Sequence, residues 1–222
     1  MQVDFCEFPD DVLYDFDNNV WVRKEKDGHV VLGITSIYSA LAGKLTKVTI
    51  KPVGSVVAKT QNVATIESLR YFGAVKSPLP CRIIAINEAL QLKPKLANDY
   101  PYSDGWFAKL QPTPLNGEVQ GLSSSLGAEA KIRSIIHNLR VRCFKAYPDY
   151  ELWEIGVECA AVLVRLSELI ERCAVGEVVH VVSDDPTADI EMVRWSDQSG
   201  QAVLESRAEG NLIHFIVRKI KG

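Results

Sequence analysis

Cysteine is the residue type in this 222-residue chain best suited to covalent chemistry, and the chain has five of them. They lie at Cys6, Cys81, Cys143, Cys159 and Cys173. No Cys-x-x-Cys pair and no combined Cys/His ligand set occurs, so we expect no metal site. The N-terminus, MQVDFCEFPDD, lacks the basic-then-apolar order of an export signal. We therefore predict a cytoplasmic protein with reduced, mostly buried thiols, apart from an exposed Cys6 in a mobile N-terminus.

Cys159 is the cysteine best placed for sulfur chemistry, because it opens a segment with helical periodicity, 159–172. The apolar face of that segment consists of Val162, Leu163, Leu166, Leu169 and Ile170. The free N–H groups and the dipole of a helix N-terminus favour a thiolate. Neighbouring Glu158 would oppose that charge. The structural alternative is a small residue that packs at the start of the helix.

Other polar residues give weaker signals. The chain has four histidines, which are isolated in the sequence, and we expect structural roles for those on predicted strands. These are His29, His180 and His214. Asp184 and Asp185 are expected in a turn, with Asp185 as the N-cap of a helix that starts at Pro186. No glycine-rich phosphate loop occurs.

The composition and length of the chain exclude some classes of protein and indicate how many domains it has. The hydrophobic content is 47%, the charged content is 24% and the net charge is −3. Such a charge gives no general attraction to nucleic acid or anionic lipid, and we expect neither as a partner. No apolar run has the length of a membrane span. A chain of 222 residues suits two compact domains.

The residue pattern divides the chain into a β half and an α/β half. Short β-branched runs broken by Gly, Pro and Asn predict a barrel or sandwich over 1–110, including a hairpin turn at Lys26-Asp27-Gly28. Pro, Gly and Ser mark a linker over 111–127. A basic connecting helix is expected over 128–148, with Cys143 in it. Its basic face is expected to be solvated, the alternative being an acidic partner or a membrane surface. Strand, helix, strand, helix, strand, strand follow over 149–222.

Residues 20–110 resemble the H protein of the glycine cleavage system. The resemblance is carried by VWVRKEKDGHVVLGIT, YSALAGKLTKVTIKPVGSVV, IESLRYFGAVKSP and INEALQLKPKLANDYPYSDGWFAKL. It implies an all-β barrel-sandwich hybrid, the fold of lipoyl carriers. In that family a lysine on an exposed hairpin turn carries lipoate through an amide bond.

Arg70 stands where the resemblance places the lipoyl lysine. The match from Glu67 to Pro78 has no gap, so a slip in the alignment does not explain the change. A guanidinium stays protonated and cannot accept lipoate, so we expect no lipoate here. The tip of this hairpin consists of Glu67, Arg70, Tyr71 and Phe72, a composition suited to contact with another protein. Alternatively, the two aromatic residues point alternately into and out of the barrel.

Residues 150–220 resemble sulfur carriers of the TusA/SirA type. The resemblance is carried by YELWEIGVEC, Val-Gly-Glu at 175–177, Ser-Asp-Asp-Pro at 183–186 and HFIVRK. It implies a two-layer α/β sandwich of order βαβαββ. In that family the matching cysteine opens a Cys-Pro-x-Pro motif and carries sulfur as a persulfide. Here Ala160 and Ala161 follow Cys159, so both prolines are missing.

These features favour a non-catalytic adaptor or regulator that docks on protein partners of lipoate- or sulfur-transfer metabolism. One alternative is a sulfur carrier or sulfurtransferase with a transient persulfide on Cys159. The other is a carrier of the glycine cleavage type that is lipoylated on another lysine, of which Lys76 is the nearest to Arg70.

Overall fold

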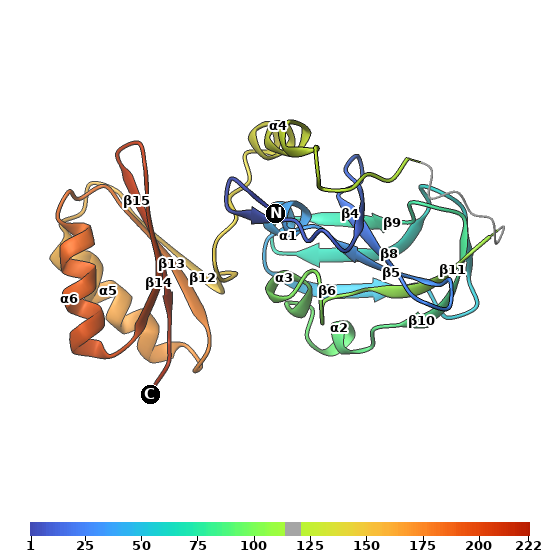
Figure 1. Ribbon diagram of the computed structural model, residues 1–222. Helices are drawn as coiled ribbons and strands as arrows, with labels where there is room; N and C mark the ends of the chain where they lie inside the picture. The colour runs from blue at the N-terminus through green and yellow to red at the C-terminus, as the bar shows by residue number, and fades with distance from the viewer. Residues whose placement is uncertain (114–120) are drawn as a thin grey trace. The chain divides into compact units, whose positions relative to one another are not determined.

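The computed structural model describes residues 1–113 and 121–222 and divides into two compact units, Met1–Cys143 and Phe144–Gly222 (Figure 1). The expected linker, 111–127, falls partly outside the described residues. The expected connecting helix begins and ends inside the first unit, since α4 spans Glu129–Leu139. Among the described residues, no helix is long and apolar enough to cross a membrane.

Two antiparallel sheets build the barrel of the first unit. The larger has the order β3-β4-β5-β11-β10-β7, with β3 at Leu13–Asp15, β4 at Val20–Lys24, β5 at Val30–Ile34, β7 at Val56–Val57, β10 at Cys81–Ile86 and β11 at Ala108–Pro112. The smaller has the order β6-β8-β9, with β6 at Leu45–Ile50, β8 at Asn62–Ser68 and β9 at Phe72–Lys76. Both sheets contribute to one apolar core that includes Leu32, Ile66, Ile83 and Phe107. The predicted turn between β4 and β5 is confirmed, with Gly28 at φ 84°.

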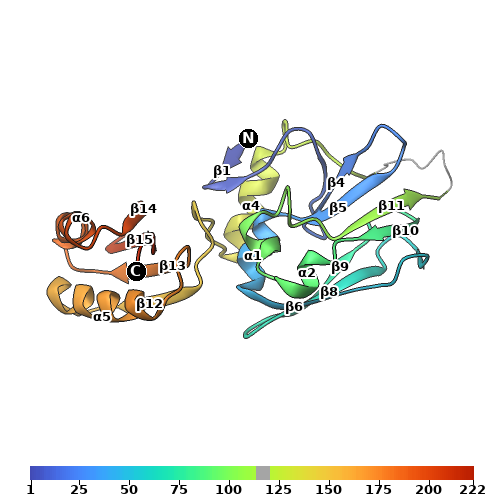
Figure 2. The ribbon, with the colours of Figure 1, turned by 90° about the horizontal axis from the view of Figure 1, so that it is seen from below.

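A second core lies on the outside of this barrel. It joins the N-terminal ribbon, β1 at Gln2–Val3 and β2 at Cys6–Glu7, to the apolar stripe of α4 through Ile132 and Ile136; Figure 2 shows β1 next to α4. At its centre, the Trp21 indole donates hydrogen bonds of 2.9 Å and 3.0 Å to the carbonyls of Ile34 and Pro101. A Cβ on Gly33 would lie 2.3 Å from the Trp21 ring, so only glycine fits there.

The basic side chains of α4 are largely paired within the first unit. Lys131 contacts Asp17, and Arg133 contacts both Asp4 and Glu129. The helix ends where Arg140 adopts a left-handed conformation. Its basic face is therefore in good part used for holding the N-terminal segment, which weakens the reading of α4 as a site for an acidic partner.

A disulfide joins Cys6 to Cys143, which are 137 residues apart in sequence. The expectation of five reduced thiols is therefore wrong for these two, and Cys6 is fully buried in the second core rather than exposed. Cys143 also lies beyond the end of α4 and not in the helix. Sequence spacing could not reveal the pair, because the ribbon and the segment after α4 meet only in the folded unit. Cys81, Cys159 and Cys173 are buried and form no disulfide.

Loss of this disulfide should destabilise the first unit by about 2–5 kcal/mol, because it closes a long loop in the unfolded chain. The double variant Cys6→Ser, Cys143→Ser should unfold at a clearly lower temperature than the wild type under non-reducing conditions. Dithiothreitol should lower the midpoint of the wild type and leave that of the variant unchanged. Quantitative thiol labelling that finds five free cysteines in the unfolded wild type would contradict the pairing.

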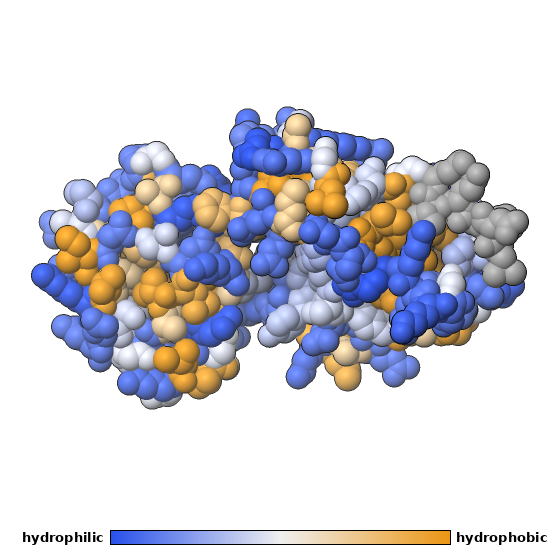
Figure 3. All heavy atoms as spheres, in the orientation of Figure 1, coloured by the Kyte–Doolittle hydropathy of each residue, from blue (hydrophilic) through white to orange (hydrophobic). Residues whose placement is uncertain are grey.

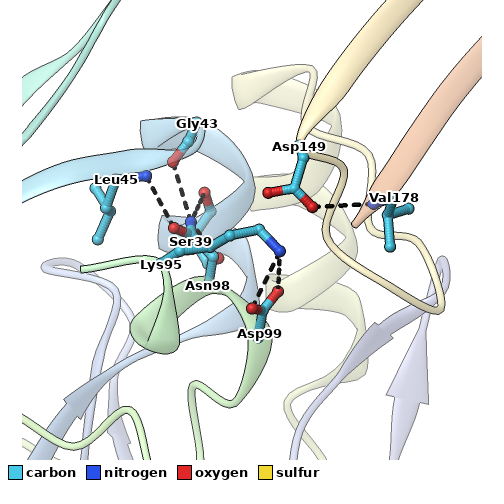
Figure 4. Close-up of polar contacts among 8 residues, drawn as sticks. All are labelled: Ser39, Gly43, Leu45, Lys95, Asn98, Asp99, Asp149 and Val178. Atoms are coloured by element: carbon cyan, nitrogen blue, oxygen red, sulfur yellow. Dashed lines mark hydrogen bonds and ion pairs between the residues drawn. The ribbon is translucent and has the colours of Figure 1, made fainter. Parts of the chain in front are cut away.

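Short helices join the strands of the first unit: α1 at Ser36–Ala42, α2 at Ala89–Leu92 and α3 at Leu96–Asp99. Asn98, on α3, is buried and fastens the end of α1 to the start of β6. Its carbonyl oxygen accepts from the Leu45 N–H at 2.9 Å, and its amide donates to the Gly43 carbonyl and the Ser39 hydroxyl at 3.0 Å each (Figure 4). Every polar atom of the amide is thus engaged, and the loop at Gly43 is fixed.

Replacing Asn98 with alanine should cost about 1–3 kcal/mol of unfolding free energy for each buried backbone group that loses its partner. Chemical denaturation would measure this. The matched control is Asn138→Ala on α4, where the exposed amide makes one 3.4 Å contact with Ser134. The control should change stability by less than about 0.5 kcal/mol. Equal effects of the two substitutions would argue against the fastening role.

The second unit is a two-layer α/β sandwich, as expected. Its sheet has the order β12-β13-β15-β14, in which β12 and β13 are parallel and the other pairs antiparallel. The elements are β12 at Tyr150–Glu154, α5 at Cys159–Arg172, β13 at Val178–Ser183, α6 at Ala188–Ser199, β14 at Ala202–Glu209 and β15 at Leu212–Arg218. Both helices lie against the same side of the sheet in Figure 1. Leu166 of α5 packs there with Val181 and Phe215.

Two of the histidines are paired and not isolated. On β13 and β15, His180 Nε2 lies 2.9 Å from His214 Nδ1, and the rings stack with centroids 5.1 Å apart. The Phe144 ring lies 4.6 Å from that of His180, and the Arg207 guanidinium lies over Phe144. The cluster is on the sheet face opposite α5 and α6, and it holds the first residue of the unit against the sheet. The reading of His180 and His214 as structural fits this arrangement.

Candidate functional site

The first candidate site is the turn between β8 and β9. Glu67 pairs with Phe72 in register, and the Ser68 N–H donates to the Tyr71 carbonyl at 2.8 Å, so the chain reverses within three residues. Leu69, in that turn, is fully exposed, and Phe72 is 71% exposed. Large apolar side chains this exposed at the end of a hairpin form a surface that a partner protein can bury.

The Arg70 side chain lies against the loop that follows α1. A Cβ built on Gly43 would be 3.1 Å from Arg70 Nε and 3.7 Å from Arg70 Cγ, and Gly43 has φ 80°. Ser68 reinforces this contact, because its hydroxyl donates to the Ala42 carbonyl at 2.6 Å. The carbonyl end of a helix is a favourable place for a cation. The Arg70 side chain therefore lies beside the loop at Gly43, near the carbonyl end of α1.

The two aromatic residues of the tip have different roles. The Tyr71 ring packs edge-on against Tyr38, with centroids 6.0 Å apart, and it covers Gly73, where a Cβ would lie 2.4 Å from it. The Tyr38 hydroxyl in turn donates to the Ala74 carbonyl at 2.9 Å. Tyr71 thus belongs to the barrel, whereas Phe72 faces solvent. The two aromatic residues therefore alternate between the barrel and solvent, and contact of the tip with a partner stays a prediction.

Two charged residues of the β8–β9 hairpin lie at different distances from the turn. Glu67 pairs with Lys47 across β8 and β6 at 2.9 Å. Lys76, the nearest lysine along the chain, is the last residue of β9 and pairs with Asn62 at the far end of the hairpin from Arg70. Its position in a strand, away from the turn, differs from the exposed turn on which a modifying enzyme acts.

The second candidate site is Cys159 at the N-terminus of α5. The residue is 4% exposed, and its thiol pKa is raised by burial and then by the negative charges of Asp185 and Glu191. The sequence pointed to Glu158 as the opposing charge. In the structure Glu158 is the N-cap residue and makes no side-chain cap bond. The acids that act on the thiol come from the loop before α6 and from α6 itself.

Asp185 has a different role from the predicted one. Helix α6 begins at Ala188, after Thr187, and not at Pro186. One oxygen of Asp185 accepts from the Thr187 N–H at 2.7 Å and from the Thr187 hydroxyl at 2.6 Å. The other accepts from the Cys159 N–H at 2.8 Å, so Asp185 caps α5. These bonds lower the pKa of the Asp185 carboxyl, the Thr187 hydroxyl contributing most.

The described residues contain no group of three or more His, Cys, Asp or Glu side chains arranged to hold a metal ion. Arg70 and Cys159 lie in different units, so each has to be understood within its own fold. Sequence reasoning found both positions but missed the contact between Asp185 and Cys159. The only sequence signal was the acidic pair before Pro186, and that pair does not reveal which N–H group it meets.

Comparison with known proteins finds a matching protein family for each of the two units. The family model of the glycine cleavage H-protein matches residues 12–135, and that of the sulfurtransferase TusA matches residues 154–219. Glycine cleavage system H protein 2 of Aquifex aeolicus is 38% identical over 138 residues, which are 62% of this chain and 86% of that protein. H protein 5 of the same organism is 39% identical over 145 residues, 64% of this chain and 98% of that protein.

A solved structure agrees with the fold of the first unit. The crystal structure of a glycine cleavage system H protein from Mycobacterium marinum matches with a TM-score of 0.51 and 25% identity, covering 56% of this chain and 98% of that one. The H-protein match includes most of α4 and ends before Cys143, while Cys6 precedes it. Both cysteines of the disulfide therefore lie outside the matched region. The chain belongs to the glycine cleavage H-protein family and carries a TusA sulfur-carrier domain after its H-protein-like domain.

Proposed function

We propose that this chain is an adaptor or regulator of lipoate- or sulfur-transfer metabolism that binds partner proteins through the β8–β9 turn without carrying lipoate. Both families represented here work with partner proteins in lipoate or sulfur transfer. The observation that carries the proposal is Arg70, which occupies the exposed turn and lies against Gly43. A guanidinium has no free amine lone pair for an amide bond, so this turn can present a surface but cannot hold the prosthetic group.

The shape of the turn supports a docking role. Leu69 and Phe72 expose apolar surface on either side of Arg70, while Tyr71 anchors the turn to the barrel through its packing on Tyr38. Arginine and aromatic side chains dominate the energy of protein interfaces, and a rigid surface loses little entropy on binding. A turn that no longer moves a cargo is thus well suited to binding the enzymes that process such cargo.

The second domain is proposed to take part without holding a persulfide. Sulfur transfer needs an accessible thiolate, because the thiolate is the nucleophile. Cys159 is nearly buried, and its surroundings favour the neutral thiol. No resident cofactor is proposed for either domain, and the cytoplasmic location remains a prediction.

The proposal that this chain cannot accept lipoate can be tested with a lipoylation assay. The wild type, incubated with lipoate–protein ligase, lipoate and ATP, should gain no lipoyl mass. Arg70→Lys should gain one lipoyl group, located on residue 70 by peptide mapping, because the turn is exposed and otherwise similar to the family's. Lys76→Arg serves as the matched control and should behave as the wild type does. Lipoate on any lysine of the wild type would refute the proposal.

The docking claim can be tested by competition. The wild type should inhibit the ligase-catalysed lipoylation of a separate H protein, and Phe72→Ala should weaken this inhibition by about tenfold, or about 1.4 kcal/mol, the loss typical of an interface anchor. Val53→Ala removes a side chain that is also exposed, at 56%, but lies elsewhere, and should have no effect. No inhibition by the wild type, or equal losses in the two variants, would count against docking through this turn.

The sulfur claim is tested with a cysteine desulfurase and free cysteine. The wild type should show no sulfur adduct on Cys159 under conditions that load an authentic sulfur carrier. An adduct on that peptide, absent in Cys159→Ser, would instead support the sulfur-carrier alternative.

A further inference from the structure

Helix α1 connects the region of the disulfide to the β8–β9 turn within the first unit. Its first residue is Ser36, whose N–H donates to the Tyr102 hydroxyl at 3.1 Å and whose hydroxyl donates to the Glu7 carbonyl at 2.9 Å. The Tyr102 hydroxyl donates to the same carbonyl at 2.7 Å. Glu7 follows Cys6 in the N-terminal ribbon, so the start of α1 is fastened to the strand that carries one half of the disulfide.

The other half of the disulfide lies at the same end of α1. Cys143 follows α4, and its sulfur is 3.8 Å from the Ser36 carbonyl oxygen. Both cysteines are buried in the second core together with Ile37, the second residue of α1. In Figure 3, apolar residues (orange) border the polar residues of α4 on the side that faces the barrel. Opening the disulfide therefore removes a covalent bond from the core that covers the start of α1.

The opposite end of α1 fastens the β8–β9 turn. The Ser68 hydroxyl donates to the carbonyl of Ala42, the last residue of α1, at 2.6 Å. In the middle of the helix, the Tyr38 ring packs edge-on against Tyr71, and its hydroxyl donates to the Ala74 carbonyl of β9 at 2.9 Å. Helix α1 has seven residues, which is about two turns. A shift at its start is therefore carried to the contacts at its end.

The N-terminal ribbon is a short element for which a cross-link matters. Strands β1 and β2 have two residues each and form a separate two-stranded sheet. The turn between them places Asp4 and Phe5 at φ 45° and 68°, a region that costs non-glycine residues free energy. Asp4 pairs with Arg133 of α4, but ion pairs near the surface contribute little to stability. The disulfide is thus a strong restraint on a weakly paired element.

We propose that the Cys6–Cys143 disulfide is a redox-sensitive latch that holds the β8–β9 turn in its binding conformation through α1. A dithiol opens the latch: the S–S bond breaks, each cysteine sulfur gains one electron and one proton, and the dithiol becomes a disulfide. The start of α1 then loses its covalent support, the turn opens more often, and it binds a partner more weakly. This inference rests on the proposed function, because it concerns the regulation of the same turn.

Hydrogen exchange at the turn tests the latch without a partner. The Ser68 N–H, which donates to the Tyr71 carbonyl, should exchange slowly in the oxidised wild type. Dithiothreitol should raise the exchange of a peptide over residues 66–74 about fivefold, a modest coupling between two sites. The double variant Cys6→Ser, Cys143→Ser should exchange at the higher rate with or without dithiothreitol. If that variant fails to fold, the oxidised and reduced wild type still provide the comparison.

The turn between β4 and β5 is the matched reference. It also opens locally, its Gly28 N–H donates to the Glu25 carbonyl at 3.2 Å, and it lies at the end of β5 away from α1. Its exchange should not depend on dithiothreitol. Equal exchange of the β8–β9 turn in the oxidised and reduced wild type would overturn the inference. A rise of the same size at both turns would show a general loosening and would overturn it as well.

The variant Ser36→Ala tests the route through α1. It removes the hydroxyl that joins α1 to Glu7 and keeps both cysteines. The difference in exchange between the oxidised and reduced protein should become smaller at the β8–β9 turn, because contacts in one network are not additive. Ser134→Ala, on α4, is the control and should keep the full difference. Equal differences in the two serine variants would contradict the route.

The competition assay separates the latch from the proposed function. The oxidised wild type is compared with the double cysteine variant in the absence of a reductant, because a reductant would also open the disulfide of lipoate. About fivefold more of the variant should be needed to inhibit lipoylation of a separate H protein to the same extent. No inhibition by the wild type would refute the proposed function. Equal inhibition by both proteins would overturn the latch alone.

Discussion

The register between β8 and β9 is the constraint on which the first site depends. Ile66 pairs with Gly73, and Ala64 pairs with Val75, so the side chains that enter the barrel core are determined by which residues face each other. Since side chains alternate across a strand, a slip of one residue would bury Phe72 and expose Ile66. The core therefore fixes the turn, and the turn fixes Arg70 beside Gly43 with Leu69 and Phe72 in solvent.

The proposed function depends on one position in each domain. In the barrel, the Arg70 side chain lies near the carbonyl end of the short helix α1. In the α/β domain, Cys159 is nearly buried at the start of α5, and the Asp185 carboxylate from another loop accepts its N–H. In both domains, the chemistry open to the residue thus depends on a group that is distant in sequence and close in the fold.

The disulfide ties together the two ends of the first unit. Cys6 and Cys143 lie outside residues 12–135, which the H-protein family model matches, and they connect the N-terminal ribbon to the segment after α4. A disulfide persists in oxidising surroundings and is rare in a reducing cytoplasm. The disulfide is thus unusual for the cytoplasmic location that the sequence predicts. It also anchors the last residue of the first unit covalently, immediately before the second unit begins at Phe144.

The sequence by itself determined what is local. The pattern of apolar and turn-forming residues predicted the hairpin at Lys26-Asp27-Gly28, the helix that begins at Cys159 and the order of strands and helices after residue 149. The resemblance to the H protein, and not this pattern, placed Arg70 in a turn. Only the tertiary structure decided which distant groups meet. Cys6 pairs with Cys143, His180 with His214, and Asp185 with the N–H of Cys159. Periodicity tells which side of an element faces the core, but the partner across that core depends on how whole elements pack, and it leaves no repeat in the sequence.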